Sequence, residues 1–318
     1  MAVDLTGLIP ISRRTIAADI PSPADIYLLA AGDQVPEVFC TAGASPSEAR
    51  MGELASRTDV TLYVRPHQRQ EYQQHLDENW HDLVFAPGGR PCEKVAVVGE
   101  IVREVLRDAF RGGNTDQIVE EARKLAEKIC YVLDGQAVLA SELFDLLHHD
   151  YAVFTHSTNV ALYSVTLARE LGFSAADQQE IALGGLLHDI GKLELDENLL
   201  NKTGQLTRLQ YREIMLHPVH GFCRLVDRAE ISFGQLMMVY QHHERADGSG
   251  YPSSIVAEEI HPWASICAIA DAYEALTAER PYRAGLPPEK AIATLTEMKG
   301  KLDCEMLSCW EKLICQTV

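Results

Sequence analysis

Two adjacent histidines, His242 and His243, open the stretch of this chain whose residue types are best suited to chemistry. They lie in Gln241–Pro252, which reads Gln-His-His-Glu-Arg-Ala-Asp-Gly-Ser-Gly-Tyr-Pro. Neighbouring imidazoles point in different directions from a regular helix, so they can bind one metal ion only where the backbone departs from helical geometry. Glycine permits positive φ angles and proline fixes its own φ, so the loop after the histidines is expected to close in a single shape. Taken alone, such a pair is more often a polar helix end followed by a turn.

Other residues of metal-ligand type lie in the same half of the chain, where nine of the twelve histidines follow residue 147. His156 stands on a segment of helical pattern, His188-Asp189 ends another, His217 precedes a proline, and Asp271 lies among alanines and an isoleucine. A carboxylate in such apolar surroundings is costly to bury unless a cation or hydrogen bonds compensate it. Each residue singly has a simpler explanation, such as a His-Asp hydrogen bond or a capped helix end.

Together these residues predict a dinuclear centre. Mixed imidazole and carboxylate ligands without thiolate suit iron or manganese, and also zinc. Seven ligands are too many for one metal site and fit two metal ions that share a bridging carboxylate. Two metal ions about 3.5–4 Å apart can activate a water molecule and hold a phosphate for in-line displacement at phosphorus.

A helical domain over residues 136–318 is expected to position these ligands. From Ser141 onward, apolar residues recur at helical spacing. Two amphipathic helices before it, Val95–Phe110 and Gln117–Leu133, form a connector over residues 93–135 or a dimer surface. The helices predicted within the domain cover residues 136–148, 152–171, 175–189, 208–216, 219–228, 233–243, 262–278, 288–299 and 304–315.

Residues 1–92 are expected to form a small α/β module, so that the chain is α+β overall. Pro87–Pro91 is the linker signal that ends the module. The module contains no catalytic constellation, and a sensory or partner-binding role rests only on its being a separate domain. Its predicted elements are strands at 25–29, 37–40 and 60–64, a helix at 46–57 with a capping box that begins at Ser45, and an exposed helix at 68–80.

The composition bounds what the chain can bind. Its 318 residues, 47% hydrophobic and 23% charged, are enough for two globular domains. The formal net charge is −18, so a long nucleic acid is not an expected partner. No run approaches the roughly 20 apolar residues that cross a bilayer, and the eight cysteines are scattered. We expect a cytoplasmic protein that does not contact a membrane.

The joint motif resembles the HD-GYP family, a branch of the HD phosphohydrolases. It consists of His188-Asp189-Ile-Gly-Lys192, His242-His243-Glu244 and Asp247-Gly-Ser-Gly-Tyr-Pro252. The resemblance extends from about Ser141 to Ala293 and does not cover the first 130 residues. It implies an all-α metalloenzyme that hydrolyses the bacterial second messenger cyclic di-GMP to linear pGpG and often to GMP.

The resemblance also implies how the ligands are divided. His156, His188, Asp189 and Asp271 would form one metal site, and Asp189 would bridge to a second metal held by three histidines, His217, His242 and His243. The two divalent ions would be iron, with manganese as the alternative and zinc ranked below both. Some members bind a third metal through a glutamate four residues before the first ligand; Ala152 stands there, so a two-metal centre is expected.

Charged residues receive roles by the same resemblance. Lys192 would contact the scissile phosphate and, with the bridging Asp189, belong to the catalytic group. Arg280 and Arg283 would hold phosphate or guanine groups; the alternative is a solvated helix end, which applies more to Arg283 than to Arg280. Asp150 would touch a guanine or the metal edge, unless it is a helix N-cap. Glu244 and Tyr251 are expected to orient a ligand histidine and to shape the loop.

Three functions remain open on the sequence. The leading one is a cyclic di-GMP phosphodiesterase. The second is a weakly active or inactive cyclic di-GMP receptor that signals to a protein partner through the N-terminal module or the Gly-Tyr-Pro loop. The third is an HD phosphohydrolase of another nucleotide, including related cyclic dinucleotides. A homodimer is compatible with each.

Overall fold

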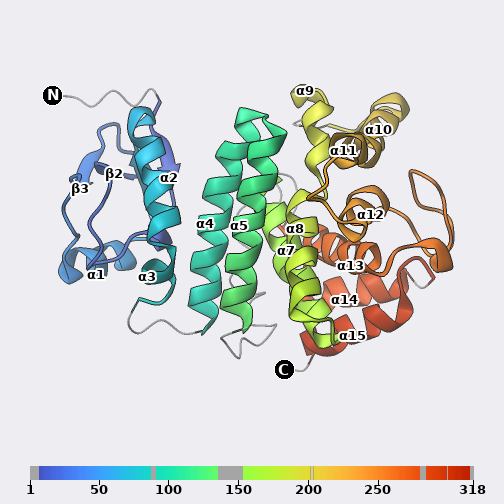
Figure 1. Cartoon of the computed structure of the whole chain (residues 1–318). Helices are drawn as coiled ribbons and strands as arrows, with labels where there is room; N and C mark the ends of the chain where they lie inside the picture. Colours follow the sequence, from blue (N-terminus) through green and yellow to red (C-terminus); the bar gives the residue numbers. More distant parts are fainter. Residues whose placement is uncertain are drawn as a thin grey trace. The chain divides into compact units, whose positions relative to one another are not determined.

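The structure of the chain is a computed structural model, and it describes residues 7–86, 91–134, 153–200, 202, 204–279, 284–298 and 300–315. By packing, the chain divides into two compact units, Met1–Val105 and Leu106–Val318, which are described separately below. The division falls inside helix α4 (Pro91–Gly112), which is followed by α5 (Thr115–Asp134) (Figure 1). Both helices are longer than their apolar spacing predicted.

The first unit is built on a four-stranded antiparallel sheet in the order β1-β4-β2-β3. Its central pair aligns Tyr27 with Tyr63 and Leu28 with Leu62, and the strands predicted at 25–29 and 37–40 pair with each other as β2 and β3. The strands are β1 (Ile9–Ile11), β2 (Ile26–Ala30), β3 (Glu37–Cys40) and β4 (Val60–Val64), and the helices are α1 (Glu48–Ser56), α2 (Arg69–Glu78) and α3 (Trp80–Val84).

Two predictions for this unit were wrong in detail. Helix α1 is capped by Ser47, whose side chain accepts from the backbone N–H of Arg50, and not by Ser45. Helix α2 was expected to be exposed because it is polar. Instead it buries Tyr72 and Leu76 almost completely, at 1% and 0% exposure. These two apolar residues are four positions apart and therefore lie on the same face of the helix, which packs against the rest of the unit.

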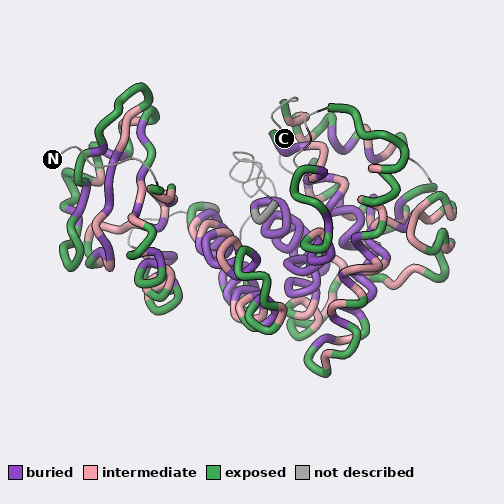
Figure 2. Tube along the Cα trace, turned by 90° about the horizontal axis from the view of Figure 1, so that it is seen from above, coloured by how far each residue is buried: buried purple, intermediate pink, exposed green. Residues whose placement is uncertain are grey.

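The regular elements of the second unit are helices in its described residues, as expected for this part of the chain, and loops and one isolated β-bridge between Asp247 and Val256 connect them. Helix α7 packs against α8 and α13, α8 also packs against α5 and α12, and α12 lies against α11 and α13. Figure 2 shows that the buried residues follow these inner helices. The elements are α7 (Val153–Glu170), α8 (Ala175–Leu187), η3 (Ile190–Glu194), α9 (Glu197–Leu200), α10 (Arg208–Ile214), α11 (His217–Leu225), α12 (Phe233–Gln241), η4 (Ala257–Glu259), α13 (Pro262–Thr277), α14 (Pro288–Glu297) and α15 (Cys304–Cys315).

Two consecutive glycines let α8 approach its neighbours closely. A Cβ atom on Gly185 would lie 2.7 Å from the Cα of Ala161 in α7, and one on Gly184 would lie 2.3 Å from the sulfur of Met238 in α12. Real Cβ atoms do not make contacts this short, so Gly185 is required against the backbone of α7, whereas a larger residue at 184 would require the Met238 side chain to move. As a result, the ends of α8 and α12 and the start of α7 meet at one place.

Several helices end earlier than their apolar pattern predicted. Helix α8 ends at Leu187 and α12 at Gln241, each directly before a histidine. His217 begins helix α11, where the sequence placed it between helices. The helix predicted over residues 136–148 lies outside the described residues. Within the described parts of the chain, none of the helices combines the length and apolar character needed to cross a bilayer.

Candidate metal centre

Five histidines and two aspartates of the second unit converge at the meeting point of these helices. His156 comes from α7, His188 and Asp189 follow the end of α8, and Asp271 comes from α13. His217 begins α11, and His242 and His243 follow α12. Six of the seven are buried, and His243 has a side chain that is 20% exposed.

The first cluster consists of His156, His188 and Asp271, whose potential ligand atoms lie within 4.8 Å of one another. The Nε2 atom of His156 is 3.2 Å from the Nε2 atom of His188. It is also 3.2 Å from Oδ1 of Asp271. The family resemblance implied that these three residues form one metal site together with Asp189.

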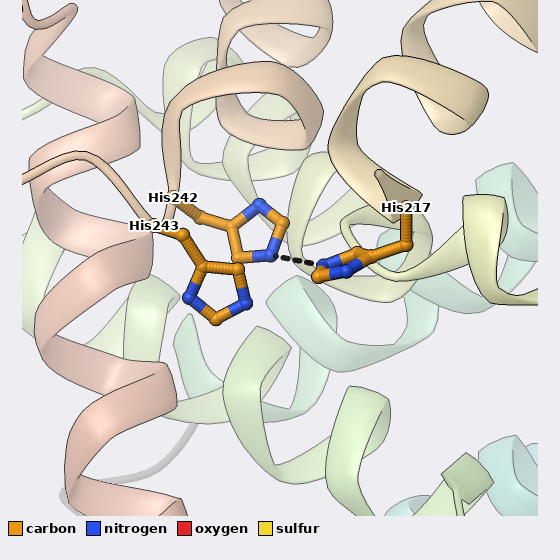
Figure 3. Close-up of side chains that lie close together, drawn as sticks. All are labelled: His217, His242 and His243. Atoms are coloured by element: carbon orange, nitrogen blue, oxygen red, sulfur yellow. Dashed lines mark hydrogen bonds between the residues drawn. The ribbon is translucent and has the colours of Figure 1, made fainter. Parts of the chain in front are cut away.

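The second cluster consists of His217, His242 and His243, again with ligand atoms within 4.8 Å of one another. Figure 3 shows the three imidazoles converging, with the Nε2 atoms of His217 and His242 3.2 Å apart. The centroids of the adjacent rings of His242 and His243 lie 4.2 Å apart, at 44°. Both residues lie beyond the last residue of α12, although His242 still has right-handed helical backbone angles, φ −61° and ψ −17°.

Asp189 lies between the two clusters, and each of its carboxylate oxygens faces one of them. Its Oδ2 is 3.5 Å from Nε2 of His156 and 3.4 Å from Nε2 of His188. Its Oδ1 is 3.2 Å from Nε2 of His217 and 3.9 Å from Nε2 of His242. The side chain is 3% exposed, and Oδ1 accepts no hydrogen bond from the residues that the structure describes.

The histidine tautomers follow from the partners of the opposite ring nitrogen. Nδ1 of His188 donates to the Gly185 carbonyl at 2.7 Å, and Nδ1 of His217 donates to the Ile214 carbonyl at 2.8 Å. Nδ1 of His242 donates to the carbonyls of two residues in α12, Met238 and Val239, each at 3.0 Å. Since Nδ1 carries the proton, each Nε2 directs a lone pair inward, which is the usual arrangement of metal-binding histidines.

Glu274 holds His156 in the same way, and the sequence analysis missed it. Its Oε2 accepts from Nδ1 of His156 at 2.6 Å, and the residue is 2% exposed. The available signal was its position three residues after Asp271 on the same helix, which places both carboxylates on one face. A buried glutamate at that spacing is the carboxylate partner that a ligand histidine needs.

Burial and neighbouring charges shift the pKa values of His242, His243 and Asp189 in the direction that favours ligation, and that of His156 in the opposite direction. Burial, reinforced by the adjacent imidazoles, holds the pKa of His242 well below its usual range; for His243, burial and His217 lower the pKa to about 3. Burial raises the pKa of Asp189, but Lys192 and the histidines outweigh it and hold the pKa well below the usual value. Burial likewise lowers the pKa of His156, but Glu274 and Asp271 outweigh it and raise that pKa.

The donor set fits divalent metal ions. Inward lone pairs 3.2 Å apart repel each other unless a cation binds them, and the buried Oδ1 of Asp189 has no hydrogen-bond donor among the described residues. Neutral imidazoles and ionised carboxylates are the protonation states that bind metal. Nitrogen and oxygen donors without sulfur suit iron, manganese and zinc.

Lys192 lies at the rim of the centre. Its ammonium group pairs with Oδ2 of Asp189, and its side chain is 24% exposed. Its predicted contact with a phosphate stays a prediction. Three further residues with predicted ligand contacts, Asp150, Arg280 and Arg283, lie outside the described residues, as does Ala152.

A close backbone crossing fixes the second cluster relative to Asp189. A Cβ atom on Gly191, in η3, would lie 1.9 Å from the carbonyl oxygen of His217 and 2.5 Å from the amide nitrogen of Gly221. Glycine at 191 therefore lets the turn after Asp189 lie directly on the start of α11. Gly191 is part of the sequence motif, but the need for glycine there became evident only from the close contact between η3 and α11.

The loop after His243 is closed by several local contacts. Gly248 has φ +75°, as expected for a glycine turn. Gly250 was expected to supply a positive φ as well. It is instead required by close packing, because a Cβ atom there would lie 2.4 Å from the Cα of Glu244. The Glu244 carboxylate was expected to orient a ligand histidine, but its hydrogen bond in the described structure comes from the backbone N–H of Ser253, at 2.6 Å.

Comparison with known proteins shows which proteins the chain resembles. The sequence profile of the HD domain matches residues 139–306. The fold is similar to that of Bd1817, an HDG"Y"P protein from Bdellovibrio bacteriovorus, with a TM-score of 0.70, 19% sequence identity and coverage of 96% of this chain and 98% of that one. At this identity the likeness concerns the fold alone.

Among curated proteins, the chain is similar to two named cyclic di-GMP phosphodiesterases and to a cyclic GMP-AMP enzyme. It is 34% identical over 243 residues to cyclic di-GMP phosphodiesterase PA4108 of Pseudomonas aeruginosa, covering 73% of this chain and 58% of that protein. It is 34% identical over 165 residues to a cyclic di-GMP phosphodiesterase of Thermotoga maritima, covering 51% and 45%. It is 36% identical over 160 residues to 3'3'-cGAMP-specific phosphodiesterase 3 of Vibrio cholerae, covering 50% and 35%. The chain thus spans about half the length of these relatives.

Proposed function

Since the chain belongs to the HD domain family, in its HD-GYP branch, we propose that it is a metal-dependent phosphodiesterase that hydrolyses cyclic di-GMP. The observation that carries the proposal is the position of Asp189, whose two oxygens face two separate clusters of ligand atoms. A shared carboxylate is what a pair of metal ions needs if both are to act on one phosphate. The product would be linear pGpG, and GMP if a second hydrolysis follows.

The HD domain family binds divalent metal ions, and the two clusters offer ligand sets for them. In our proposal one ion is held by His156, His188 and Asp271, and the other by the second cluster, with Asp189 shared. We propose two ions, iron first, manganese as the alternative and zinc below both. When bound, such a pair supplies a nucleophile at neutral pH and neutralises charge on the phosphate.

The residues of the chain have separate tasks in this proposal. Backbone carbonyls of α8 and α12 and the carboxylate of Glu274 accept hydrogen bonds from Nδ1 of His188, His242 and His156. These bonds hold each imidazole in the tautomer whose Nε2 is free to bind a metal ion. Lys192, partly exposed beside Asp189, supplies positive charge to a phosphate group that enters the centre and to the 3′ oxygen that leaves. We assign Arg280, Arg283 and Asp150 to the phosphate and guanine groups of the ligand.

A second substrate is favoured by one observation. Relatives at similar identity include an enzyme named as specific for 3'3'-cGAMP. This nucleotide differs from cyclic di-GMP in having an adenine in place of one guanine. The two cyclic dinucleotides share the phosphodiester linkage, so the metal centre alone does not discriminate between them. The choice would depend on side chains that contact the bases.

The remaining proposals concern organisation. We propose a regulatory module over residues 1–92, a connector over 93–135 and a catalytic domain over 136–318, in a cytoplasmic protein. The module or the Gly-Tyr-Pro loop would contact a protein partner, and the chain would form a homodimer. Light scattering on the purified protein, with and without cyclic di-GMP, measures the oligomeric state.

The experiment that tests the function combines metal analysis with product identification. Protein purified without oxygen is analysed for bound metal and then incubated separately with cyclic di-GMP and 3'3'-cGAMP, with Asp189→Ala as the control. Two metal ions per chain and pGpG or GMP as products would support the proposal. Two metal ions with preferred cleavage of 3'3'-cGAMP would support the second substrate. Tight binding of cyclic di-GMP without any product would contradict the enzyme and support a receptor.

A further inference from the structure

His243 differs from the other four histidines of the centre in how its ring is held. Each of the others directs Nδ1 to a carbonyl or to Glu274. Among the residues described, neither ring nitrogen of His243 makes a hydrogen bond, and its Nδ1 lies 3.8 Å from Oδ2 of Asp271. Its side chain is also the most exposed of the five, at 20%. Hydrogen bonding therefore leaves the orientation of this ligand undetermined.

An aromatic ring from the following loop lies against His243 instead. The ring of Tyr251 packs on the imidazole with centroids 4.7 Å apart and an interplanar angle of 30°. The backbone N–H of Tyr251 donates to the carbonyl of His243 at 3.2 Å, so the two residues are tied at the backbone as well. The same ring lies 6.4 Å from that of His217, at 81°. Stacked and edge-to-face contacts of this kind restrict how a ring can rotate.

Tyr251 is in turn held by contacts on both sides of the loop. The buried carboxylate of Glu244, 2% exposed, accepts the backbone N–H of Ser253. The hydroxyl group of Ser253 lies 3.0 Å from that of Tyr240 in α12. Gly250 packs directly on the backbone of Glu244 and leaves the loop no room to move inward. The loop is therefore anchored to the residue that directly follows the two ligands.

We propose that Tyr251, anchored through the loop by Glu244, is a positioning residue that sets the ring of His243 for the metal ion held with His217 and His242. The inference rests on the proposed two-metal centre. The stacked ring of Tyr251 orients His243 in place of a hydrogen bond. Metal binding should therefore depend on the planar ring of Tyr251 and not on its hydroxyl group. Loss of a partner that orients a ligand typically weakens metal binding about 10–100-fold.

The test measures metal binding alone, with apoprotein titrated calorimetrically with Mn²⁺ in the absence of nucleotide. The wild-type protein should show two binding events. The event that is absent from the titration of the His217→Ala variant is assigned to the ion of the second cluster. Tyr251→Ala should weaken that same event about tenfold and leave the other within about twofold of wild type. Tyr251→Phe, which keeps the ring, should bind both ions as wild type does. If Tyr251→Ala does not fold, Tyr251→Leu takes its place, because it keeps apolar volume without a planar ring.

A matched pair of variants tests the anchor. Glu244→Ala removes the acceptor of the Ser253 N–H and should weaken the event of the second cluster. Ser253→Ala keeps that backbone N–H and loses only the hydroxyl contact with Tyr240, so it should weaken the event of the second cluster less than Glu244→Ala does. The positioning proposal is overturned if Tyr251→Ala changes neither binding constant, if it weakens the event that His217→Ala retains, or if Tyr251→Phe is as weak as Tyr251→Ala. A wild-type protein that binds only one ion would instead contradict the two-metal centre on which the proposal rests.

Discussion

At the scale of single residues, the centre depends on one carboxylate that serves two clusters. Asp189 is 3% exposed and has an oxygen directed at each group of histidines. The other ligands were assigned above to one cluster each, although His188 and His242 also lie within 4.8 Å of each other beside Asp189. A change at Asp189 should therefore affect both sites, whereas a change at any other ligand should affect mainly one.

Replacing Asp189 by alanine should remove both metal ions and the activity together. Loss of a shared anionic ligand should weaken binding of each ion by at least about a hundredfold, more than loss of a residue that only orients a ligand. Metal analysis after dialysis and calorimetric titration measure this. His217→Ala is the comparison, since it should affect one ion. Two ions retained by Asp189→Ala would contradict the bridging role.

Replacing Lys192 by alanine should separate metal binding from turnover. The ammonium group is not a ligand, so both ions should stay bound, while hydrolysis should slow about 10²–10³-fold because a cation near the phosphate is lost. Rates at saturating cyclic di-GMP and metal content of the same sample are the measurements. An unchanged rate would remove Lys192 from the catalytic group, and loss of metal would show that it acts by holding Asp189.

At the scale of elements, backbone crossings bring the ligands together. Helix α8 reaches α7 and α12 through Gly184 and Gly185, and η3 lies on α11 through Gly191. His188 and His242 directly follow the last residues of α8 and α12, and His217 is the first residue of α11. Geometry of this kind has no signal in apolar periodicity, which explains why the predicted helices over 175–189 and 233–243 ran two residues too far.

Replacing Gly191 by alanine should damage the second cluster without touching a ligand. The added methyl group would lie 1.9 Å from the His217 carbonyl oxygen, so η3 and α11 must separate. We expect a loss of about 1–3 kcal/mol in the free energy of unfolding. Metal binding at the second cluster should weaken as well. Thermal unfolding and Mn²⁺ titration measure both effects.

The matched control for this change is Gly204→Ala. A Cβ atom on Gly204 would meet nothing within 4 Å, so stability should stay within about 0.5 kcal/mol of wild type. Equal stability of the Gly191 and Gly204 variants would contradict the role of the crossing.

At the scale of the whole molecule, the sequence predicted the architecture better than the boundaries. The small module and the helical domain are confirmed, as is the likeness to the HD-GYP family. The seven predicted ligands could be selected because five histidines and two aspartates gather in one predicted helical domain, and the structure brings potential ligand atoms of these residues together. Glu274 was missed since a buried glutamate on a helix looks like a surface residue until its neighbour His156 is known. Strand β1 was missed because three residues with a central proline carry no periodicity.

Deleting residues 1–92 should leave a folded protein that binds metal. The ligand clusters all lie after residue 153, and the cut precedes most of α4, so it does not interrupt the helices of the second unit. Circular dichroism melting and metal analysis of residues 93–318 test this. Aggregation without bound metal would contradict the predicted boundary and move it toward the division at Val105.

The glycines described above also bear on how mutational tolerance should be interpreted. Gly185, Gly191 and Gly250 carry no functional group, yet each occupies a position where one methyl group would collide with the backbone of a neighbouring segment. In a saturation mutagenesis screen scored on activity, these positions should tolerate substitution as poorly as the histidines do. Intolerance in such a screen would then mark two different constraints, donor chemistry and lack of space. Only metal affinity and unfolding free energy, measured variant by variant, would separate them.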